Sequence, residues 1–151
     1  MDAVQDGNHT SPGMWRDPHG RLRIRVENRD SCVLIRVGGE IDYLTADSFR
    51  DHVLSHAAAP WRIILDLQDV EFCDSSGLGA LVSLWKTVTA EGGRLVLACP
   101  SPVCRRILQR TGLDGHIMTS SVLRRAFAMV AADQPGVRPS PLVPGARQDA
   151  S

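Results

Sequence analysis

A carboxylate and two hydroxyls stand together where an apolar run gives way to a helical pattern: Asp74 is followed by Ser75 and Ser76. The first turn of a helix leaves backbone N–H groups unpaired, and the helix dipole adds positive character there. This position therefore favours an anion such as a phosphate group. A serine at the start of a helix is also a common cap, and the local chemistry alone leaves both interpretations open.

Glycine recurs in the turn that follows, because Gly77 and Gly79 flank Leu78. Inside a helix each glycine costs about 1 kcal/mol relative to alanine, so helix stability does not explain this pair. Without side chains, the turn would let the backbone of another protein approach closely, and we predict that it is a contact surface. The spacing matches neither G-x-x-x-x-G-K-[ST] nor G-x-G-x-x-G, so a phosphate-binding loop is not indicated.

Glu40 and Asp42 precede the first expected helix, on the side where the Ser75 loop should emerge. They are predicted to extend the contact surface, and solvated loop acids are the alternative. No base, nucleophile or metal cluster accompanies them, so we expect no enzyme. His52 and His56 have the i,i+4 spacing of a metal site, but no third ligand follows. A helix surface is the favoured interpretation, and no metal or cofactor is predicted.

Hydrophobic patterning places these residues in an α/β domain. Alternation predicts an edge strand over 22–26 and, after a turn at 28–31, a strand over 32–37 that Gly38 and Gly39 break. Helical patterns beginning near Thr45, Ser75, Ser101 and Ser120 alternate with strands over 62–65, 95–98 and 116–118. This order predicts a mostly parallel sheet of four to five strands, with an antiparallel edge strand and about four helices.

Length and composition indicate one folded domain over 21–132, with disordered tails over 1–20 and 133–151 that are rich in glycine, proline and polar residues. The formal net charge is +0, without the basic excess of a nucleic-acid binder. No apolar run has the length of a membrane span or a signal peptide, so neither membrane association nor secretion is expected. The four cysteines have no zinc or disulfide spacing, which favours a reduced, cytoplasmic chain.

The segment Asp74-Ser75-Ser76-Gly77-Leu78-Gly79 resembles the signature of the STAS domain, specifically that of anti-sigma-factor antagonists. Two further blocks are similar to this family: Gly39-Glu40-Ile41-Asp42 followed by Thr45-Ala46, and Gly112-Leu113 at the end of the third expected helix. The resemblance covers about residues 22–132. It implies the STAS fold, which agrees with the element order derived from patterning.

The resemblance also implies a mechanism. Such an antagonist binds a serine kinase that serves as an anti-sigma factor, and binding frees the sigma factor. The kinase then uses ATP to phosphorylate the serine directly after the signature aspartate, which is Ser75 here, and a PP2C-type metal-dependent phosphatase resets it. Ser76 is the second candidate acceptor. The expected partner-binding residues are Glu40, Asp42, Asp74, Ser75, Ser76, Gly77, Leu78 and Gly79.

The expected switch blocks an interface and leaves the fold intact. A phosphoserine carries about −1.5 to −2 charges, which the N-terminal end of a helix should tolerate. The free protein is expected to be a monomer or a weak homodimer. Two alternatives remain from the same resemblance: a STAS scaffold in a stress-sensing complex with little control by Ser75, or an accessory subunit of a lipid or anion transporter.

Overall fold

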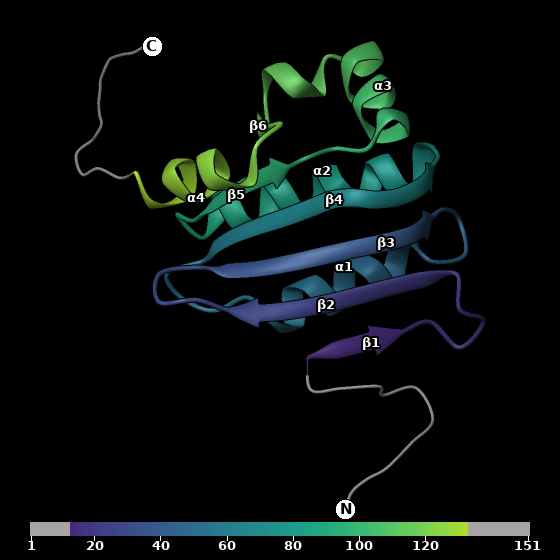
Figure 1. Ribbon diagram of the computed structural model, residues 1–151, viewed down its shortest axis with the longest axis horizontal. Coiled ribbons are helices and arrows are strands. Elements are labelled where there is room, and N and C mark those ends of the chain that lie inside the picture. The colour runs from purple at the N-terminus through teal and green to yellow at the C-terminus, as the bar shows by residue number, and fades with distance from the viewer. Residues whose placement is uncertain (1–12, 133–151) are drawn as a thin grey trace, which may run out of the picture.

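The computed structural model describes residues 13–132, which form a six-stranded mixed sheet with four α-helices and one short 3-10 helix (Figure 1). The elements are β1 (Met14–Arg16), β2 (Leu22–Asn28), β3 (Val33–Ile41), α1 (Ala46–Ser55), β4 (Arg62–Cys73), α2 (Ser75–Ala90), β5 (Arg94–Ala98), α3 (Pro102–Thr111), η2 (Leu113–Gly115), β6 (Met118–Ser120) and α4 (Leu123–Ala131). The strands lie side by side in chain order. β1, β2 and β3 are antiparallel neighbours, whereas β3 to β6 are parallel.

The sheet has one strand more than the predicted four to five, because residues 13–20 do not belong to a disordered tail. They form β1 and the turn into β2, with Trp15 in register with Ile24. The Trp15 side chain packs against the main core, and this contact fixes a strand of only three residues. The other residues of the two predicted tails, 1–12 and 133–151, lie outside the described residues.

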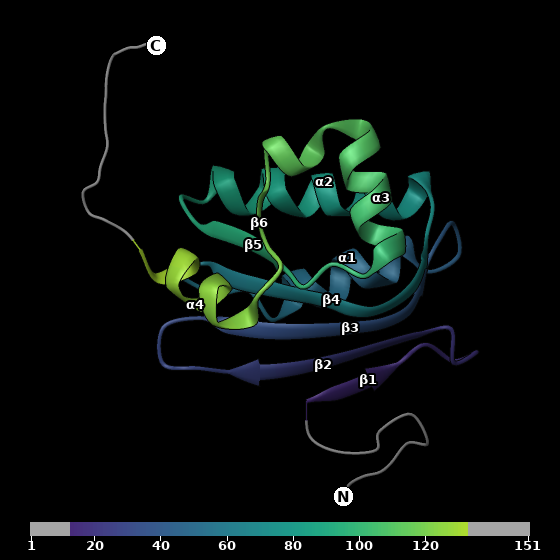
Figure 2. The ribbon, with the colours of Figure 1, turned by 45° about the horizontal axis from the view of Figure 1, so that its top comes forward.

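Helices cover the sheet unequally on its two faces (Figure 2). Side chains from α1, α2 and α3 join one large core with the sheet; among them Phe49 and Leu81 are fully buried. α4 packs on the opposite face in a smaller cluster around Ile64 and Val96. Trp85 is half-buried at the margin of the large core. Each fully buried large apolar side chain contributes about 1.5–3 kcal/mol to folding.

β3 continues through Gly38 and Gly39 to Ile41, so the predicted break in this strand is wrong. Gly39 has φ +96°, and a Cβ at this position would collide with the carbonyl oxygen of Arg21. The register with β4 shifts at these glycines, yet pairing resumes at Glu40. At each shift β4 has one residue more than β3, so the irregularity is a bulge of β4 opposite the glycines, and β3 continues through it.

β4 is likewise longer than the predicted 62–65 and runs over Arg62–Cys73. The residues that precede Ser75 are thus paired strand and not a loop. Ile41 and Cys73 are register partners at the carboxyl ends of β3 and β4. Since α1 follows β3 and α2 follows β4, the N-terminal ends of both helices meet at the same end of the sheet.

Candidate functional site

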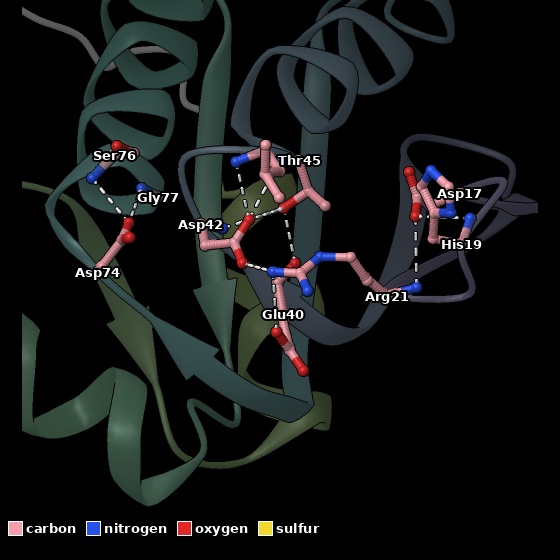
Figure 3. A network of polar contacts seen from close by, with 10 residues as sticks. Asp17, His19, Arg21, Glu40, Asp42, Thr45, Asp74, Ser76 and Gly77 are labelled. Carbon is pink, nitrogen blue, oxygen red and sulfur yellow. Dashed lines mark hydrogen bonds and ion pairs between the residues drawn. The ribbon is translucent and has the colours of Figure 1, made fainter.

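Asp74 is the N-cap of α2 and holds the start of the helix in place. Its backbone is extended, and its Oδ1 accepts hydrogen bonds from the N–H groups of Ser76 at 2.8 Å and Gly77 at 3.1 Å (Figure 3). The backbone N–H groups of Ser76 and Gly77 are therefore already bonded to the Asp74 carboxylate, and they are not free to bind the anion that the sequence predicted here.

Ser75 occupies the first helical position and is exposed, whereas Ser76 is half-buried. A hydroxyl that another protein is to modify must be reachable, and Ser75 meets this condition. The structure therefore ranks the two candidate acceptors in the order that the sequence indicated. Whether either residue is modified stays a prediction.

The two glycines of the first turn face opposite ways. Gly77 is buried, and a Cβ there would collide with the carbonyl oxygen of Ile41 and lie 2.9 Å from the Sγ of Cys73. Gly79 is exposed, and a Cβ on this residue would meet no atom within 4 Å. Gly77 is thus needed for the close packing of α2 on β3 and does not lie on a contact surface, which corrects the prediction for this residue. Gly79 alone keeps the helix surface open, beside a half-buried Leu78.

Asp42 is engaged inside the protein and is only 7% exposed. Its Oδ1 accepts from the backbone N–H of Leu44 at 2.9 Å and of Thr45 at 3.2 Å, and its Oδ2 pairs with the Arg21 guanidinium (Figure 3). Arg21 also contacts Glu40 at 3.1 Å. Asp42 is therefore neither an open partner contact nor a solvated acid, because its oxygens form the turn that leads into α1.

Thr45 takes the predicted N-cap position of α1 without capping by its side chain. Its hydroxyl donates instead to the backbone carbonyl of Glu40 at 2.7 Å, across the turn. Glu40 is half-buried at the end of β3, so its carboxylate remains partly available at the edge of the site. Of the two predicted acids, only Glu40 retains an accessible carboxylate.

Three large apolar side chains are exposed at this end of the sheet, and none of them was predicted from the sequence. Tyr43 is 81% exposed, Leu44 68% and Phe72 45%. Tyr43 and Leu44 lie between β3 and α1, and Phe72 is the register partner of Glu40 near the end of β4. We call these three residues the apolar rim. The signal was an apolar pair placed between Asp42 and the start of a helix, where a surface turn is normally polar.

A groove of about 290 Å³ separates α1 from α2 beside the rim. It is lined by Tyr43, Ala46, Asp47, Arg50, Ser76, Gly79 and Ala80. Tyr43 therefore adjoins the first two turns of α2, and the open Gly79 forms part of the groove wall. The arrangement offers a mixed apolar and charged surface next to the exposed Ser75.

The thiol beside the site belongs to the core. A hydrogen bond with Cys104, together with burial, raises the pKa of Cys73 above its ordinary range. Cys73 is 6% exposed and packs under Gly77, so it acts as a small hydrophobic side chain.

His52, near the end of α1, and His56, its C-cap, make ring contacts. Within residues 13–132, no three His, Cys, Asp or Glu side chains gather closely enough to hold a metal ion. The rings of His52 and His56 lie with centroids 5.0 Å apart, and His52 stacks on Trp15. In the same range no helix is both long and apolar enough to cross a membrane.

The STAS domain model matches residues 23–126, and the chain belongs to this family. An anti-sigma F factor antagonist of Paenibacillus polymyxa is 30% identical over 95 residues, which cover 61% of this chain and 80% of that protein.

Solved structures agree with this assignment. A crystal structure of an anti-sigma factor antagonist from Thermotoga maritima superimposes with a TM-score of 0.66 at 27% identity, covering 71% of this chain and 93% of that one. The structure of the Bacillus cell fate determinant SpoIIAA in its phosphorylated form gives a TM-score of 0.56 at 28% identity, covering 71% and 98%. The Paenibacillus and Thermotoga relatives are anti-sigma factor antagonists by name.

Proposed function

We propose that this protein is an anti-sigma-factor antagonist that binds a serine-kinase anti-sigma factor and is inactivated by phosphorylation of Ser75. The observation that carries the proposal is the exposed Ser75 at the same end of the sheet as the apolar rim. The names of the relatives support the general role, and the phosphorylated form of one of them supports control by phosphate. In this proposal the chain is a substrate, so ATP and its metal ion belong to the kinase.

The apolar rim supplies the binding energy in this scheme. Aromatic and large aliphatic side chains that become fully desolvated at the centre of an interface carry most of its affinity. Tyr43 and Leu44 are exposed in the free protein, so a partner that covers them removes their apolar surface from water. Ser75 lies at the same end of the sheet, where the partner's active site must reach it.

Phosphate on Ser75 would act through this shared surface. Because Asp74 holds the N–H groups of Ser76 and Gly77, the phosphate finds fewer donors at the helix end and an adjacent carboxylate that repels it. The dianion is therefore directed outward, into the surface that the kinase covers. A loss of about 3 kcal/mol there weakens binding roughly a hundredfold. A PP2C-type phosphatase would restore the binding form.

The test is phosphorylation of the purified protein by candidate serine kinases with Mg-ATP, followed by mapping of the phosphate by mass spectrometry. We expect modification at Ser75, none in Ser75→Ala, and normal modification in Ser76→Ala. In calorimetry, Ser75→Glu should bind the kinase more weakly while unfolding within about 1 kcal/mol of wild type. If Ser75→Glu binds the kinase with the affinity of wild type, the proposed phosphorylation switch is wrong and a scaffold role is favoured.

A further inference from the structure

The face of the sheet opposite α1 and α2 carries a cluster of arginines that the site at Ser75 does not use. Alternate residues of a strand point to the same face, so Arg23 and Arg25 of β2 project away from the buried Leu22 and Ile24. Register places Arg16 of β1 beside Arg23, and Arg36 of β3 beside Arg25.

α4 covers one end of this face, where it clusters with Leu34 of β3 as well as with β4 and β5, and it leaves the rest of the face over β1 to β3 bare (Figures 1 and 2). A groove of about 220 Å³ follows the bare part. Its lining consists of Met14, Arg16, Arg23, Arg25, Arg36, Val37, Gly38 and Asp69. We call it the arginine groove.

The charge of the groove is largely uncompensated. Arg36 pairs with Glu27 at 3.4 Å and lies 3.9 Å from Asp66. In contrast, no ion pair joins Arg16, Arg23 or Arg25 to an acid within residues 13–132. Asp69 is the single acid of the lining, against four arginines. The arginine groove thus contains three guanidinium groups that form no ion pair with an acid of the described residues.

The groove is also shaped by the backbone beneath it. A Cβ on Gly38 would lie 2.6 Å from a guanidinium nitrogen of Arg23 and 3.2 Å from the Cβ of Asp69. The absence of a side chain at Gly38 therefore leaves room for the Arg23 guanidinium over β3. Because the guanidinium group is planar, it loses less conformational freedom for each hydrogen bond that it makes to a carboxylate.

We propose that the arginine groove docks an extended acidic segment of a partner protein. Arg23 and Arg25 are two residues apart on one strand, so their side chains are spaced by roughly 7 Å. An extended peptide with carboxylates at alternate positions has the same spacing. Arginine binds carboxylates in a planar, two-point geometry, which suits this match.

Two features favour a protein segment over a nucleic acid. No aromatic side chain lines the groove, so nothing is available to stack on a base. The chain as a whole has a net charge of +0, so it lacks the long-range attraction that draws a basic protein to a polyanion. The groove lies on the opposite face of the sheet from α2, so it acts independently of phosphorylation at Ser75.

Fluorescence anisotropy tests the proposal with a labelled peptide of alternating glutamate and serine, the matching lysine-serine peptide, and a single-stranded RNA of equal length. The variant Arg16→Ser/Arg23→Ser/Arg25→Ser removes the three positive charges of the groove that form no ion pair with a described acid. The matched control Arg105→Ser/Arg106→Ser/Arg110→Ser removes the same charge from exposed positions on α3. Should the groove variant fail to fold, the single exposed change Arg25→Ser replaces it.

We expect the acidic peptide to bind wild type and the α3 variant alike, and to bind the groove variant roughly tenfold more weakly, since three exposed charge pairs together account for about that factor. Higher salt should weaken binding, and the lysine peptide should not bind. Equal loss in both triple variants, absence of acidic-peptide binding, or tighter binding of the RNA would overturn the proposal. Phosphorylation of the groove variant at Ser75 reports separately on the proposed function.

Discussion

Gly77 and Gly79 are two residues apart in one helical turn, and their surroundings differ completely. Gly77 lies against the end of β3, where a Cβ would collide with the Ile41 carbonyl oxygen, whereas Gly79 faces open space. The first glycine is fixed by packing, and the second costs helix stability without any internal gain. Internal packing does not explain glycine at position 79, so the remaining explanation is contact with another molecule at this surface.

Alanine at the two positions should have opposite effects. We expect Gly77→Ala to lower the free energy of unfolding by about 1–3 kcal/mol, because the added methyl group must displace backbone. Gly79→Ala should raise it by up to about 1 kcal/mol through helix propensity. Urea denaturation measures both values. A Gly77→Ala protein as stable as wild type would show that α2 can move away from β3 at little cost.

Asp74 can stabilise the start of α2 through its hydrogen bonds and through its negative charge, and substitutions distinguish the two contributions. We expect Asp74→Ala to lower the free energy of unfolding by about 1 kcal/mol, because the N–H groups of Ser76 and Gly77 lose their acceptor. Asp74→Asn retains an acceptor oxygen and should stay near wild type in thermal denaturation. If Asn and Ala are equally destabilising, the negative charge and not the hydrogen bonds holds the helix start.

At the scale of elements, β1 depends on a contact with α1. The rings of Trp15 and His52 stack with centroids 4.9 Å apart and planes inclined by 27°. Burial, and then the neighbouring His56, lower the pKa of His52. Protonation of this imidazole therefore opposes the packed arrangement that attaches the edge strand.

The stability of the protein should fall as the pH drops below about 6.5, the ordinary pKa of histidine. Below that value the unfolded chain binds a proton at His52 that the folded chain, with its lowered pKa, does not yet bind. We expect His52→Phe, which keeps a ring against Trp15, to lose less stability than wild type between pH 7.5 and 5.5. His19→Gln, at an exposed turn, should follow wild type. Parallel curves for wild type and His52→Phe would contradict the assignment.

At the scale of the whole molecule, the sheet separates two surfaces of different chemistry. The apolar rim and Ser75 lie where the parallel strands end and α1 and α2 begin. The arginine groove lies on the bare face over β1 to β3. Distinct partners or distinct parts of one partner can therefore be bound without competing for the same residues.

Removal of two of the three side chains of the apolar rim should weaken binding and leave the fold intact. We expect Tyr43→Ser/Leu44→Ser to weaken kinase binding at least tenfold, about 1.4 kcal/mol, with little change in stability because both side chains are exposed in the free protein. Val122→Ser, which removes an exposed apolar side chain before α4, is the matched control and should bind normally. Calorimetry measures both, and equal binding by all three proteins would argue against the rim as the contact.

Sequence patterns predicted most of the elements, including the start of α2 at Ser75, the Ser101 cap of α3 and its end at Gly112. They failed where a strand continued through an unusual backbone, as at Gly39, or contained too few residues to show a period, as in β1. Asp42 was placed on the surface because its ion-pair partner Arg21 lies 21 positions earlier in the chain.

What the sequence by itself determined is local: a capped helix with Ser75 at its first position, since capping and helical periodicity act between residues a few positions apart. Only the tertiary structure decided which glycine is buried, that Tyr43 shares a groove with Ser76 and Gly79, and that arginines from three strands share another groove. Those relations depend on strand order and register, which are set by contacts between distant segments, and a shift of one residue would reverse every face of a strand.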